Sequence, residues 1–311
     1  MLTNVVFTLI FSFSIAASIV GLLFCSIIFF VIISYHPCHT ATNLLLLNTC
    51  VAIIIFYIST IIGSVLGFDE DWALNQPAGI FNAYCFLASC SLICCSYMLQ
   101  AINRLCCTVF FKHKHLVTIQ VTWYLIALYW IMGLLFAIEP LFFKNGFIYE
   151  RESRLCVRNA KVVSISIFST FVGFGIPLNL SILIYATIWY RVLQSSRRVG
   201  SVIAENANYN MPKARCQMKL VRNMIIVIGS FAGGDSLALV LVLWHAIKIN
   251  RPLPEPLYLI SKPDITVCVI LMIITLFFMN TQVKNAAFVY LKCNIRHIYP
   301  VTITMKGIAS C

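Results

Sequence analysis

Five polar side chains fall on one face of the long apolar stretch 79–111. At 100° per residue they lie within about 60° of one another, and a positive charge, Arg104, follows the last of them. These residues are Asn82, Ser89, Ser96, Gln100 and Asn103. Amide and hydroxyl groups in such a row can exchange hydrogen bonds, and none of them forms a nucleophile–base pair. The pattern therefore predicts hydrogen bonding inside a helix bundle and not catalysis.

Polar side chains within a membrane face the protein interior, so 79–111 is predicted to be the central helix of its bundle. Two interpretations remain open for the stripe. It either serves only as hydrogen-bonding contact between helices, or it belongs to a functional centre that has Arg104 at its cytoplasmic mouth. For Arg104 itself the alternative is a topology-setting charge that reaches to the membrane interface.

Asp235 is the other residue that demands an explanation, because it stands near the middle of the apolar stretch 219–248. A carboxylate at that depth costs roughly 2.5–3.5 kcal/mol, and such residues usually have a function. The alternative is that Asp235 is protonated and hydrogen-bonded to a neighbouring serine or asparagine.

The composition places these residues in a membrane. Of 311 residues, 61% are hydrophobic and 10% are charged, with a mean hydropathy of +0.93, whereas soluble domains carry about 25% charged residues. The net charge of +12 is attributed to basic cytoplasmic loops beside anionic lipid, and not to nucleic acid. No Cys/His spacing indicates a metal site, no phosphate loop is present, and no cofactor or enzymatic activity is expected.

The elements that must position these residues are seven apolar spans, each long enough to cross a bilayer. They form a single all-α domain, 1–311, with a short tail at 283–311. The predicted spans are 5–34, 43–67, 79–111, 116–143, 161–192, 219–248 and 257–282. Residues 284–296 are expected to form a short amphipathic helix at the membrane. With the N-terminus outside, fourteen Lys and Arg residues fall inside and eight outside, which predicts an extracellular N-terminus and a cytoplasmic C-terminus.

Several motifs occur in the order and spacing of the rhodopsin-like (class A) G-protein-coupled receptors, which the chain resembles over its whole length. Asn103-Arg104-Leu105 resembles the family's Asp/Glu-Arg-Tyr, and Asn43-Leu-Leu-Leu-Leu-Asn48 resembles the start of its second span. Asn280-Thr-Gln-Val-Lys284 resembles its Asn-Pro-x-x-Tyr. The structural markers of the fourth and fifth spans are Trp130 with Pro140, and Pro177 with Tyr185 eight residues later.

The resemblance implies a divergent orphan receptor of the plasma membrane. It would transduce an extracellular ligand to a heterotrimeric G protein by opening of the sixth span. The residues implied in coupling are Arg104, Tyr185, Asn103, Arg197 and Arg198. Asn103 in place of the family's acid removes an ion pair that would hold Arg104 at rest, so elevated basal activity is expected. The basic loop 193–218 has an alternative role, which is to set topology and bind anionic lipid.

The same resemblance implies a ligand pocket that is mainly apolar. Its residues are Phe86, Leu87, Cys90, Asp235, Ser236, Val240, Ile270 and Ile274. Phe86 stands where amine receptors carry an Asp, and Ile274 where light receptors carry a Lys, so neither an amine receptor nor an opsin is expected. Asp235 lies at the floor of the family's pocket, which suggests a cationic or hydrogen-bonding ligand.

The departures from the family are also informative. Gly79 stands where the family carries the third-span cysteine that pairs with one in the second outer loop, here Cys156, so this disulfide is expected to be absent. Gly233-Gly234-Asp235 replaces the family's Trp-x-Pro. Two alternatives to the receptor remain: a membrane transporter or channel, and a seven-helix chemosensory receptor of another family.

Overall fold

The structure is a computed structural model that describes most of the chain. The described residues are 4–68, 76–109, 118–143, 146–150, 154–158, 167–168, 170–202, 226, 229–230, 232–234, 236–237, 240, 243–244 and 255–298. The side chains of 76, 192, 195–202, 255–258 and 290–298 are not described. The predicted sixth span, 219–248, therefore lies mostly outside the described residues, as does Asp235.

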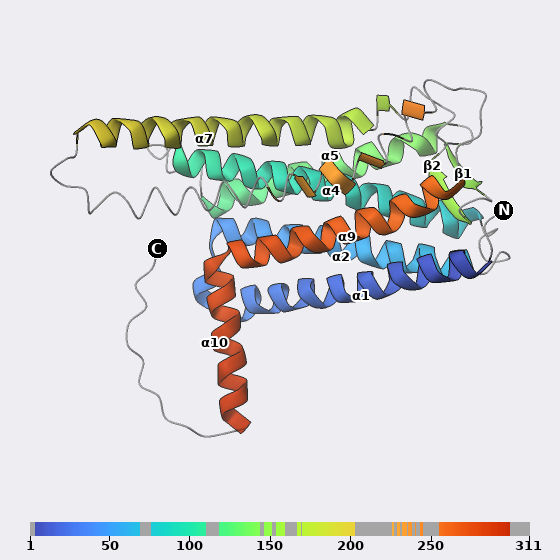
Figure 1. The fold of residues 1–311 in the computed structure, drawn as a ribbon, viewed down its shortest axis with the longest axis horizontal. Coiled ribbons are helices and arrows are strands. Elements are labelled where there is room, and N and C mark those ends of the chain that lie inside the picture. The colour runs from blue at the N-terminus through green and yellow to red at the C-terminus, as the bar shows by residue number, and fades with distance from the viewer. Residues whose placement is uncertain are drawn as a thin grey trace.

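Long helices dominate the fold and lie side by side with their axes roughly aligned (Figure 1). They are α1 (Asn4–Ser34), α2 (Ala41–Phe68), α4 (Gln76–Thr108), α5 (Ile119–Ile138), α7 (Ile176–Val202) and α9 (Glu255–Met279). Within the described residues, these six contain the helical segments that are long and apolar enough to cross a membrane. The predicted all-α membrane bundle is confirmed.

The ends of the helices follow local chemistry. Thr118 caps α5, because its hydroxyl accepts a hydrogen bond from the Val121 N–H at 3.4 Å. Short 3₁₀ segments, η1 (His36–Cys38) and η3 (Glu139–Phe142), each carry a proline in their first turn. A π-helical segment, η4 (Phe171–Gly175), enters α7 just before Pro177, whose ring nitrogen cannot donate to the preceding turn.

A further helix, α10 (Thr281–Ile298), follows α9 after Asn280, runs roughly perpendicular to the other helices and projects beyond the bundle (Figure 1). It begins three residues before the expected amphipathic segment 284–296 and ends two residues beyond it.

Helix α4 occupies the centre of the described bundle. It packs against α2, α5 and α7, and it also contacts both strands of a small hairpin. The main hydrophobic core joins α1, α2, α4, α5, α9 and α10, and its largest fully buried side chains include Tyr57, Phe56 and Met272. The central place predicted for 79–111 is confirmed.

A β-hairpin lies at the end of the bundle where the chain begins (Figure 1). Its antiparallel strands are β1 (Phe147–Glu150) and β2 (Leu155–Arg158). Arg154 enters β2 with a φ of 52° and donates from Nη2 to the Asn4 Oδ1 at 2.7 Å. Leu155 packs with Phe7 and Leu259, so the hairpin is tied to α1 and α9. We call this end of the bundle the hairpin end and the opposite end the Arg104 end.

Candidate functional site

The polar stripe of α4 faces the protein interior, as its periodicity predicts. Ser89, Ser96, Gln100 and Asn103 are all buried. Gln100 Nε2 donates to Thr49 Oγ1 at 2.8 Å, and Asn103 Nδ2 donates to Thr42 Oγ1 at 3.3 Å. Both acceptors belong to α2. The C-terminal part of the stripe therefore joins α4 to α2 by hydrogen bonds between side chains.

Arg104 lies at the end of α4, close enough to the Tyr185 hydroxyl for an electrostatic interaction. Its Nη1 is buried and has no hydrogen-bond partner among the described residues. The side chain of its neighbour Asn103 turns to α2 instead. The structure thus brings the two predicted coupling residues, Arg104 and Tyr185, together and leaves part of the guanidinium unsatisfied.

Around this pair, α4 and α7 form a small buried cluster of Ala101, Tyr185 and Ile188. Met279, the last residue of α9, packs against the same cluster. Three helices therefore meet at the Arg104 end. Arg197 and Arg198 belong to the last turns of α7, and their side chains lie outside the described residues.

Asn280 lies at the junction of α9 and α10 and connects it to α2. Its Nδ2 donates to the Asn43 Oδ1, and its Oδ1 accepts from the Val283 N–H at 3.1 Å. Asn43 Nδ2 donates in turn to Gln282 Oε1 at 3.2 Å. This network fixes the turn between the two helices against the start of α2.

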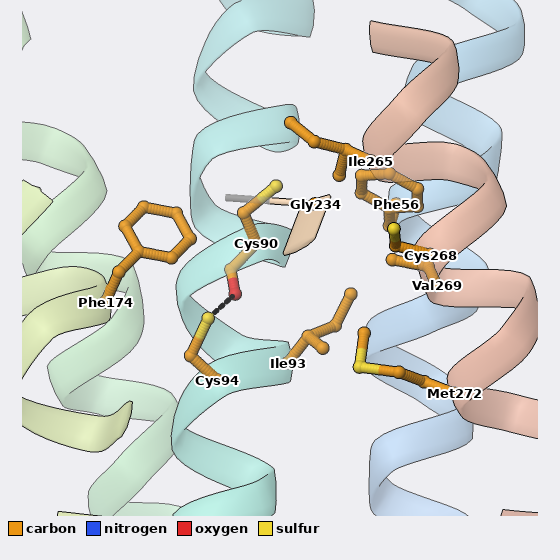
Figure 2. A pocket seen from close by; sticks show the side chains of 10 residues that line it. All are labelled: Phe56, Cys90, Ile93, Cys94, Phe174, Gly234, Ile265, Cys268, Val269 and Met272. Atoms are coloured by element: carbon orange, nitrogen blue, oxygen red, sulfur yellow. Dashed lines mark hydrogen bonds between the residues drawn. The ribbon is translucent and has the colours of Figure 1, made fainter. Parts of the chain in front are cut away.

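A small, partly open cavity lies between α2, α4, η4 and α9. Phe56 comes from α2 and Phe174 from η4, and Gly234 also lines the cavity (Figure 2). The remaining wall residues of α4 and α9 are Cys90, Ile93, Cys94, Ile265, Cys268, Val269 and Met272. Apolar and sulfur-containing side chains form this surface almost entirely, so it is suited to an apolar group.

Sequence and fold comparisons agree on what this bundle is. The family model described as "7 transmembrane receptor (rhodopsin family)" matches residues 24–279. The chain belongs to the rhodopsin family of seven-transmembrane receptors. The crystal structure of squid rhodopsin has a similar fold, with a TM-score of 0.77 and 14% sequence identity over 95% of this chain and 88% of that chain. No curated protein matches the sequence.

Family membership confirms the receptor resemblance predicted from the motifs. The family is one of receptors and not of enzymes, and it argues against a transporter or channel and against a seven-helix receptor of another family. The marker residue Trp130 has a definite contact in this receptor: its Nε1 donates to Asn48 Oδ1 at 2.8 Å. Asn48 Nδ2 donates to the Tyr129 hydroxyl at 3.1 Å, so the pair joins α5 to α2. Pro140 is buried in η3.

The residues predicted for the ligand pocket are distributed unevenly around the cavity. Cys90 lines it, and the Phe86 ring lies 5.3 Å from that of Phe56, a lining residue. Leu87 is partly buried on α4. Ser236 and Val240 are exposed, and Ser236 donates to the Gly233 carbonyl at 2.6 Å. Ile270 and Ile274 are partly buried, and the cavity is lined instead by the α9 face that carries Ile265, Cys268, Val269 and Met272.

Lys262 is a residue of the receptor that sequence reasoning missed. It is one of the eight basic residues that the predicted orientation places outside, but it lies in α9 with its Nζ 5.7 Å from the centre of the Phe86 ring. The Nζ also lies 2.7 Å from the point that a Cβ on Gly63 would occupy, as does the Asn82 Nδ2. The signal was present, because Lys262 falls inside the predicted span 257–282 and an ionisable residue within a span is a candidate functional residue.

Cys156 lies against Gly79 at the hairpin end. A Cβ on Gly79 would be 3.0 Å from the Cys156 Cβ, so the glycine stands where a bonded cysteine would be. Cys156 is a free thiol, and burial raises its pKa to about 11, because a thiolate is poorly solvated there. The hairpin is therefore held to α4 at this point by packing and not by a covalent bond.

Proposed function

We propose that this chain is a G-protein-coupled receptor of the plasma membrane. The hairpin end faces outward and admits an extracellular ligand, and the Arg104 end faces the cytoplasm and engages a heterotrimeric G protein. This orientation is supported by the excess of Lys and Arg on the segments at the Arg104 end.

The observation that carries the proposal is the state of Arg104. A buried guanidinium nitrogen without a hydrogen-bond partner among the described residues is unfavourable. A partner protein that supplies carbonyl or carboxylate oxygens would satisfy this nitrogen. Arginine suits this role because it stays charged and offers five donors.

Tyr185 would hold the open state. Its hydroxyl lies within electrostatic reach of Arg104 across the α4–α7 contact, so it can accept a hydrogen bond from the guanidinium when the sixth span moves outward. A ligand drives this change only if it binds the open state more tightly than the closed one. Arg197 and Arg198, in the last turns of α7, would add positive charge to the same cytoplasmic surface.

The test is ligand-independent dissociation of G-protein heterotrimers in cells, at matched surface expression. The native chain is compared with Arg104→Ala and with Arg191→Ala, a control that removes an exposed arginine of α7. Loss of charged hydrogen bonds at Arg104 is expected to lower the signal about tenfold or more, whereas the Arg191 variant should retain it.

Equal signals from the native chain and Arg104→Ala would contradict the assignment of Arg104. A native chain that produced no dissociation would contradict the basal coupling expected from its unsatisfied guanidinium. A matched loss in both variants would show that general positive charge, and not Arg104, carries the effect.

A further inference from the structure

We propose that the side chains of Lys262 and Asn82, toward the hairpin end, bind an acidic amphiphile, that is, a small molecule with a carboxylate and an apolar body. Lys262 and Asn82 would bind the carboxylate, and the apolar body would lie along Phe86 toward the cavity beside Phe56. This inference rests on the proposed function, since it names the class of ligand that the receptor would recognise.

The two donors converge because Gly63 has no side chain. Lys262 comes from α9, Asn82 from α4 and Gly63 from α2. The Lys262 Nζ and the Asn82 Nδ2 each lie 2.7 Å from the position of a Cβ on Gly63. Three helices therefore bring an ammonium and an amide N–H₂ to one point, next to a stretch of backbone that leaves room for both.

This pair lacks an acceptor. In the part of the chain that the structure describes, neither the Lys262 ammonium nor the Asn82 amide has a hydrogen bond or ion pair, and no charged group influences Lys262. The nearest aromatic group is the face of Phe86, 5.7 Å from the Nζ. The partly buried ammonium of Lys262 has no carboxylate beside it among the described residues, and a bound anion would pair with the two donors through charged hydrogen bonds.

The surroundings determine the remainder of the ligand. The Phe86 ring, below the ammonium, lies 5.3 Å from the Phe56 ring, and Phe56 is part of the cavity wall. Ile265 and Met272 continue this wall along α9 (Figure 2). The Phe86 and Phe56 rings thus connect the ammonium to the cavity wall by apolar contacts, and this arrangement favours a ligand whose acidic group sits at one end.

The charge preference is opposite to the one that Asp235 suggests from the sequence, which is for a cationic ligand. The sign of the ligand's charge is therefore a direct test. It also separates ligand binding from a purely structural role of Lys262, in which the side chain packs on Phe86 and extends to the membrane interface.

The experiment uses the full chain in nanodiscs of uncharged phosphatidylcholine. Matched pairs differ only in the end group: octanoate with octan-1-ol, and 4-phenylbutyrate with 4-phenylbutan-1-ol. Binding is measured as the shift in thermal midpoint across a titration, with empty nanodiscs as the blank. We expect at least one acid to bind about tenfold or more tightly than its alcohol, because charged hydrogen bonds are worth that much.

Two variants and one control test whether the preference for the acid originates at Lys262 and Gly63. Lys262→Met should abolish the preference for the acid and leave alcohol binding unchanged. Gly63→Ala keeps every charge but places a methyl group 2.7 Å from each of the two nitrogens. The flexible ends of both side chains must then move aside, so acid binding should weaken. Lys284→Met removes a lysine of α10 and should retain the native preference.

Acids that bind no better than their alcohols would overturn the proposal. A preference that survives in both Lys262→Met and Gly63→Ala would overturn it as well. Because the readout needs no G protein, acid binding without G-protein dissociation would uphold the inference while contradicting the proposed coupling. G-protein dissociation without any preference for acids would contradict the inference about the ligand and support the proposed coupling.

Discussion

Asn103 and Arg104 are neighbours in sequence, but their side chains reach different partners. Asn103 donates to Thr42 on α2, and Arg104 interacts with Tyr185 on α7. An amide at position 103 therefore serves helix packing and supplies no negative charge to its neighbour. At the residue scale, this arrangement is the physical basis for the basal activity that we expect.

An acid at position 103 should restrain Arg104. We expect Asn103→Asp to lower ligand-independent G-protein dissociation by about tenfold, because a charged hydrogen bond of about 1.5–3 kcal/mol would favour the closed state. The signal is measured at matched surface expression. Asn103→Leu, which introduces a side chain of similar size without charge, is the control, and its ligand-independent signal should not fall in the same way. An unchanged signal from the aspartate variant would contradict this account of Arg104.

Trp130 should stabilise the fold through its indole N–H. We expect Trp130→Phe to reduce stability by about 1–3 kcal/mol, because Asn48 Oδ1 would lose its donor inside the bundle. Circular dichroism during heating should show a lower thermal midpoint. Trp123 lies on the same helix with 55% of its surface exposed, so Trp123→Phe should change stability by about 0.5 kcal/mol or less. Similar losses in both variants would contradict the role given to the hydrogen bond.

At the scale of the elements, α4 was predicted well because its polar residues recur with the helical period. Burial of Ser89, Ser96 and Gln100 follows directly from that spacing. The cavity wall on α9 was harder to predict. The family resemblance selects Ile270 and Ile274, whereas Cys268, Val269 and Met272 face the cavity. The rotation of a helix about its axis depends on its neighbours, and no periodicity within an almost uniformly apolar helix reveals it.

Lys262 shows a different limit of the sequence. Charge counting treats every lysine near a span end as a topology signal. A lysine has a long flexible stem, so its ammonium can turn either to water or into the bundle. Here the outcome depends on Gly63, about two hundred residues earlier in the chain, and on the room that its missing side chain provides.

The hairpin contact allows a direct test of the packing between β2 and α4. We expect Gly79→Cys to form a disulfide with Cys156, because a Cβ at position 79 lies 3.0 Å from the Cys156 Cβ and a small shift reaches the usual 3.5–4.5 Å. The thermal midpoint should rise, with a gain of about 2–4 kcal/mol, and a reductant should reverse it. Ala78→Cys is the matched control one residue away. A Cys156 thiol that remains open to alkylation in denatured Gly79→Cys would contradict the contact.

At the scale of the whole molecule, the two ends of the bundle differ in chemistry. The hairpin end holds the unpaired donors of Lys262 and Asn82, and the Arg104 end holds the unsatisfied guanidinium. The main core lies between them and joins six helices. We therefore expect a change at one end to reach the other by movement of the helices that are packed in this core.

The orientation of the bundle is a prediction at this scale. An epitope tag at the N-terminus should be stained on intact cells, and a tag at the C-terminus only after permeabilisation, because the basic segments remain in the cytoplasm. Permeabilised cells, in which both tags should be stained, provide the control for expression. Staining of the C-terminal tag on intact cells would contradict the proposed placement of both functional ends.

The contact between Gly79 and Cys156 also affects how the protein can be made. A hairpin secured to α4 by packing presents no sulfur–sulfur bond at this contact for a reducing agent to cleave. We therefore expect correct assembly of the hairpin end during synthesis in cell-free extracts or bacterial cytoplasm supplemented with membrane, where thiols stay reduced. Purification with a reductant throughout should then protect the cysteines within the spans and leave this end of the receptor intact.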